Sequence, residues 1–129
     1  MSIEILVLAA SVILLLVHIS WQGMSFTSDV GPGYNMGPRD TERPESVTTG
    51  RLRRALTNYL ETYPAFVALA LALEVTGHAG GIGAVGAIVW LVARIVYLPL
   101  YAYGVFRIRS LVWLAAMIGL LLMLVGLFI

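Results

Sequence analysis

Four long apolar segments constrain the fold of this chain more than any other feature of its sequence. They cover about residues 3–21, 49–76, 82–103 and 110–129. Each is near the roughly 20 residues that a helix needs to cross the core of a bilayer. The chain has 129 residues, 60% of them hydrophobic, which is too much apolar surface for so small an interior to hide from water. The sequence therefore predicts one all-α integral membrane domain over residues 1–129, a four-transmembrane-helix bundle with up-down topology.

The positive charges are distributed unequally among the connections between these segments. The chain has eight arginines and no lysine, and seven of the arginines lie in or beside the loops 22–48 and 104–109. The loop 77–81 has none. The positive-inside rule therefore predicts that loops 22–48 and 104–109 are cytoplasmic and that both termini lie outside.

The second segment begins with a polar stripe. At about 100° per residue, Arg51, Arg54, Asn58 and Glu61 fall within one quarter-turn of a helix. This face continues toward the membrane interior, where polar groups need hydrogen-bonding partners or a water-filled cavity. The four residues therefore form a candidate functional site. The alternative is an internal network that only holds the helices together.

The third segment repeats the pattern. Arg94, Tyr97 and Tyr101 share one helical face, and a tyrosine stripe near a membrane surface is most often an interfacial belt. Arg94 is too deep for that explanation and needs a partner. Glu61 is the obvious acid, so we expect a structural ion pair between Glu61 and Arg94.

The start of the fourth segment carries Arg107-Ile108-Arg109-Ser110. The free N–H groups of a helix start already attract anions, and an arginine there can stabilise a thiolate. The alternative is a plain cytoplasmic anchor. With two histidines and no cysteine, no metal site is expected, and a net charge of +1 gives no case for nucleic acid.

The run Arg54-Ala55-x-x-Asn58-x-x-Glu61 resembles the RAxxNxxE signature of the MAPEG superfamily, the membrane-associated proteins in eicosanoid and glutathione metabolism. The resemblance covers nearly the whole chain and is to bacterial-type members, which implies a bacterial inner membrane. It also implies a homotrimer that binds glutathione between subunits on the cytoplasmic side.

The resemblance implies a role for each matching residue. Arg109 would hold the thiolate and Ser110 follows it, so these two are the candidate catalytic residues. The candidate glutathione-binding residues are Arg51, Arg54, Asn58, Glu61, Tyr97 and Tyr101. The sequence departs from glutathione-using relatives at Thr57, where arginine is frequent, at Tyr97, where histidine can occur, and at Trp113, where tyrosine is frequent.

Three functions remain open at this point. The leading hypothesis is a glutathione-dependent transferase or peroxidase acting on lipophilic electrophiles that arrive from the lipid bilayer. The second is a non-enzymatic membrane protein of the same family, whose Arg/Glu network is structural or binds lipid. The third is a small transporter, which fits poorly because the only acid of the first segment, Glu4, lies at its edge.

Overall fold

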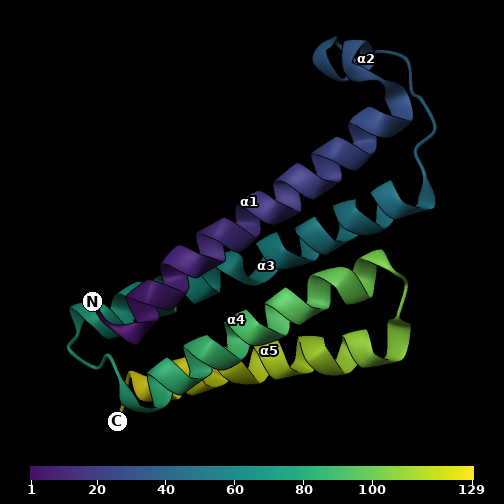
Figure 1. Cartoon of the computed structure of the whole chain (residues 1–129). Coiled ribbons are helices and arrows are strands. Elements are labelled where there is room, and N and C mark those ends of the chain that lie inside the picture. The colour runs from purple at the N-terminus through teal and green to yellow at the C-terminus, as the bar shows by residue number, and fades with distance from the viewer.

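The chain folds entirely into helices. A computed structural model describes every residue from Met1 to Ile129 and contains five helices and no strand. The four long helices form a bundle in which each runs antiparallel to the one before it, and both termini lie at one end (Figure 1). The short α2 lies beyond the far end of α1. The helices are α1 (Ile3–Val30), α2 (Pro32–Met36), α3 (Val47–Val75), α4 (Gly81–Ala102) and α5 (Phe106–Gly126).

Three of these helices, α1, α4 and α5, are long and apolar enough to cross a membrane. Many of their large apolar side chains face outward, including Leu16, Val92 and Leu121. Such a surface needs lipid around it, because soluble monomers rarely expose large apolar patches. The all-helical membrane class is thereby confirmed. Helix α3 is long enough, but its first half carries the polar stripe, so a fourth span remains a prediction.

Helix α1 is longer than the expected first segment. It continues past Trp21 to Val30, so the start of the expected 22–48 loop is helical. Side chains of the extension bond to the beginning of α3: Ser25 pairs with Thr49 at 2.6 Å, and Asp29 accepts from the Thr49 hydroxyl at 2.5 Å. These bonds hold the extension against α3 and keep it folded.

Helices α4 and α5 touch through their backbones. A Cβ added to Gly86 would lie 2.5 Å from the carbonyl oxygen of Gly119, and one added to Gly119 would lie 2.7 Å from that of Gly86. No side chain fits between the two glycines, which is the packing that small residues permit between membrane helices. This contact fixes the position of α5, and with it the polar residues on its first turns.

Aromatic rings fill the space between α3 and α4. Phe66 and Trp90 stack with ring centroids 3.9 Å apart, and Tyr59 and Tyr63 pack beside them. The Tyr59 hydroxyl donates to the carbonyl oxygen of Ser11 at 2.6 Å, so α1 is tied to the same cluster. Tyr59 adjoins Asn58 of the polar stripe in sequence, so the cluster lies beside that stripe.

Candidate functional site

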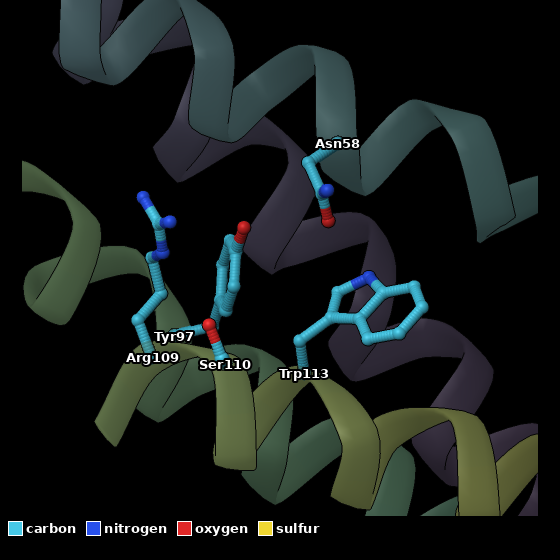
Figure 2. A pocket seen from close by; sticks show the side chains of 5 residues that line it. All are labelled: Asn58, Tyr97, Arg109, Ser110 and Trp113. Carbon is cyan, nitrogen blue, oxygen red and sulfur yellow. The ribbon is translucent and has the colours of Figure 1, made fainter. Parts of the chain in front are cut away.

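Five side chains from three helices line a cleft of about 200 Å³. Asn58 comes from α3, Tyr97 from α4, and Arg109, Ser110 and Trp113 from α5. Figure 2 shows Asn58 pointing from α3 toward the other four, while the polar ends of Tyr97 and Arg109 point back toward α3. The structure thus brings together four of the candidate residues that lie far apart in the sequence.

Asn58 is held in place by Arg94, which is fully buried. The Arg94 guanidinium donates from Nη1 to the Asn58 side-chain oxygen at 2.8 Å and from Nη2 to the Asn58 carbonyl oxygen at 3.3 Å. Its Nη2 also donates to the Thr62 hydroxyl at 2.7 Å. The Asn58 amide NH₂ therefore remains available as a donor to the cleft, and its oxygen, which has two lone pairs, can accept one more hydrogen bond.

The expected ion pair between Glu61 and Arg94 is not present, which corrects the sequence interpretation. The partners of Arg94 are the neutral oxygens of Asn58 and Thr62, and Glu61 is exposed. The physical reason is helical spacing: Asn58 and Thr62 are one turn apart on the same face, whereas Glu61 is rotated about 100° from Thr62. Arg94 therefore contributes its hydrogen bonds to the helix contact and leaves Glu61 free.

The other groups of the cleft are also donors. The Tyr97 hydroxyl and the Trp113 indole N–H form no hydrogen bond within the chain, and both face the cleft. The Ser110 hydroxyl makes only a long bond, 3.4 Å, to the carbonyl oxygen of Phe106. No acidic side chain lines the cleft. Such a cleft suits an anionic or oxygen-bearing group of a ligand.

Arg109 connects the cleft to the end of the bundle at which α4 turns into α5. Its guanidinium carbon lies 4.5 Å from the centre of the Tyr101 ring. Arg54 approaches the same tyrosine from α3, where its Nε donates to the Tyr101 hydroxyl at 3.3 Å. Two cations from different helices therefore share one aromatic ring.

A third arginine completes this end of the site. The Arg51 guanidinium lies against Gly104, where an added Cβ would be 2.8 Å from its Cζ. Gly104 has a φ of +75°, a conformation that glycine adopts without strain, and it forms the turn between α4 and α5. We call Arg51, Arg54 and Arg109 the arginine cluster. None of the three has an ion-pair partner, because the one ion pair of the chain joins Arg53 to Glu45.

The candidate residues thus fall into three places. The cleft contains Asn58, Tyr97, Arg109 and Ser110, and the arginine cluster adjoins it at Tyr101. Glu61 lies outside the cleft on the exposed side of α3.

Two buried polar residues lie outside the cleft and the arginine cluster, and the burial of one of them, Glu4, was not expected from the sequence. Glu4 is fully buried, although its position near the start of α1 suggested an exposed charge; one of its oxygens accepts from the Gly80 backbone N–H at 2.8 Å. His18 is buried against the Tyr59 ring. The presence of both on one face with Ser11, at a spacing of seven residues, is the signal that could have found them.

Comparisons with known proteins agree with the helical architecture. The model of the MAPEG family matches residues 5–129, nearly the whole chain. Neither the curated proteins nor the solved structures that were compared with the chain gave a match.

Proposed function

Because the chain belongs to the MAPEG family, we propose that it is a glutathione-dependent membrane enzyme of the transferase or peroxidase type, acting on lipophilic electrophiles. The observation that carries the proposal is the donor-lined cleft between α3, α4 and α5. Its unpaired donors and the adjoining arginine cluster match a ligand with two carboxylates and a thiol that must ionise.

Arg109 is the residue to which we assign activation of the thiol. Glutathione would supply a thiol that the cysteine-free chain lacks. The Arg109 guanidinium stabilises the thiolate, which lowers the pKa of the bound thiol toward physiological pH. Ser110, the next residue and also in the cleft, donates a second hydrogen bond to the same anion.

The remaining candidates bind the two ends of the tripeptide. Arg51 and Arg54 take carboxylates, for which a guanidinium offers bidentate hydrogen bonds. Glu61 is exposed and accepts from the ammonium group. The amide of Asn58 and the hydroxyls of Tyr97 and Tyr101 bond to the peptide groups. Of the unpaired polar groups that line the cleft, only the Trp113 indole N–H is left without an assigned role.

We further propose that the protein is a homotrimer. A cleft of about 200 Å³ is smaller than the roughly 300–1,000 Å³ of ligand pockets, and Glu61 lies outside it. A neighbouring copy placed against α3 would enlarge the cleft and enclose Glu61 with the ligand. Native mass spectrometry in mild detergent should show trimers, and a stable monomer or dimer would contradict this.

We propose that α3 is a fourth span and that the end with the arginine cluster is cytoplasmic, in a bacterial inner membrane. The chain has no cysteine, so single cysteines can report the side cleanly. Met36 and Ala79 lie at opposite ends of the bundle and are exposed. A cysteine at Met36 should be protected from impermeant reagents in intact cells, and one at Ala79 should react.

The enzyme proposal is tested with purified protein in detergent. Glutathione at millimolar concentration should raise the melting temperature, and the protein should conjugate 1-chloro-2,4-dinitrobenzene faster than a blank. S-methylglutathione should stabilise the protein without supporting conjugation, because it has no free thiol. If the protein neither binds glutathione nor conjugates the electrophile, the non-enzymatic alternative takes the place of the enzyme. In that alternative the polar network is structural or binds lipid. A small transporter is the less favoured alternative.

A further inference from the structure

The arginine cluster is a concentration of positive charge in which no member has an ion-pair partner. Arg51, Arg54 and Arg109 come from α3 and α5, and they gather around Tyr101 and the Gly104 turn. No acidic side chain forms an ion pair with any of them. Cations that stand this close repel one another unless an anion lies among them.

Aromatic side chains place the cluster at the level of the membrane surface. Trp21 packs edge-on against Tyr103, with ring centroids 6.4 Å apart, and Tyr103 is exposed beside Gly104. Phe106 is also exposed, and the Arg109 guanidinium carbon lies 5.4 Å from the centre of its ring. Tryptophan and tyrosine are enriched at the interface between hydrocarbon and water, where lipid phosphates lie.

We propose that the arginine cluster binds the headgroup of an anionic phospholipid. The phosphodiester oxygens would accept from Arg54 and Arg109 on either side of Tyr101, with Arg51 at the turn. Guanidiniums suit this ligand because their paired N–H groups match the phosphate oxygens. A net anion is favoured over a zwitterionic headgroup, whose ammonium the cluster would repel.

Lipid at this site would regulate the proposed enzyme. Arg54 and Arg109 are also the residues that we assign to glutathione, so an anionic headgroup and the tripeptide would compete. The competition rests on the proposed function, whereas the lipid binding itself does not. An increase in the anionic lipid content of the membrane should therefore weaken glutathione binding.

The test uses the full chain in nanodiscs of phosphatidylcholine with or without phosphatidylglycerol. Native mass spectrometry after release measures the phosphatidylglycerol retained per chain. Arg54→Gln should reduce retention about tenfold or more, the effect of losing a hydrogen bond between charged groups. Arg107→Gln is the matched control, because Arg107 is exposed at the same end and has no contact with Tyr101. It should retain the lipid.

The outcomes separate the possibilities. Equal loss of bound lipid in both variants would overturn the lipid site, because only the net charge would then be recognised. Loss of lipid in neither variant would also overturn it, because Arg54 would then make no contribution to binding. Displacement of the lipid by millimolar inorganic phosphate would overturn it in favour of a free anion. If lipid retention depends on Arg54 while glutathione never binds, the lipid site stands and the proposed enzyme fails. If glutathione binds equally with and without phosphatidylglycerol, the competition is wrong.

Discussion

Arg94 and the arginine cluster lie in two contrasting environments. Arg94 is fully buried, and its guanidinium donates to Asn58 and Thr62 within the same chain. The arginine cluster lies near the end of the bundle, where Arg54 and Arg109 share the Tyr101 ring and no carboxylate pairs with them. Both terminal nitrogens of Arg94 have partners and only its buried Nε lacks one, whereas the cluster contacts mainly aromatic rings and the Gly104 turn.

This difference distinguishes an arginine that stabilises the fold from arginines that are available to bind a ligand. Arg94 is buried and its two terminal nitrogens are already bonded to Asn58 and Thr62, so it is a positioning residue that holds Asn58 toward the cleft. Cations with only aromatic partners retain most of their hydrogen-bonding capacity. The division predicts that substitutions at Arg94 affect stability and that substitutions in the cluster affect binding.

The largest effect should follow from Arg94→Met. The change removes three hydrogen bonds and leaves the oxygens of Asn58 and Thr62 unpaired, so the free energy of unfolding should fall by about 3 kcal/mol. Arg54→Met is the comparison, and its effect should be within about 0.5 kcal/mol because Arg54 is exposed. Reversible unfolding in mixed detergent measures both. If both variants lose the same free energy of unfolding, Arg94 and the arginine cluster do not differ in their contribution to stability.

A smaller effect should identify the partners of Arg94. In double-mutant cycles, Arg94→Met and Thr62→Val should couple by about 1 kcal/mol, because each removes one side of the same hydrogen bond. Arg94→Met and Glu61→Gln should be nearly additive. Strong coupling with Glu61 and none with Thr62 would restore the ion pair that the structure lacks.

The smallest effect should come from the ring that the cluster shares. Tyr101→Leu removes the aromatic face under Arg109 and Arg54 and should lower stability by about 0.5–1 kcal/mol. Tyr101→Phe retains the ring and should lose less, since only the long 3.3 Å bond from Arg54 disappears. Thermal unfolding of the two variants measures the difference. If Tyr101→Phe loses as much stability as Tyr101→Leu, the contribution of Tyr101 comes from its hydroxyl and not from its ring.

The sequence was sufficient for the helical class and for the four polar residues that line the cleft, whose role remains a prediction. Apolar length predicts membrane helices with few exceptions, because the bilayer demands it. Helical periodicity likewise places Arg51, Arg54 and Asn58 on one face, and the structure brings Asn58 together with Tyr97, Arg109 and Ser110. These features depend on segment length and on the spacing of residues along one helix, both of which can be taken directly from the sequence.

Partners across the bundle were harder to predict, because they depend on the rotation of each helix. A rotation of about 100° decides whether Arg94 meets Thr62 or Glu61, and nothing in the sequence fixes it. The depth of Glu4 has a similar cause: it is buried because the start of α1 packs against the turn before α4. The extension of α1 past Trp21 depends on Asp29 meeting Thr49, another contact between segments.

The central claim is that the unpaired arginines at the cleft bind and activate a thiol ligand, and thiolate absorbance during a glutathione titration tests it most directly. The wild-type protein should give a thiolate signal at neutral pH that saturates with glutathione. Arg109→Ala should abolish the signal while partial binding persists through Arg54 and Glu61, and Arg107→Ala should leave the signal unchanged. A wild-type protein that forms no thiolate, or an Arg109→Ala variant that forms it as well as the wild type, would contradict the account.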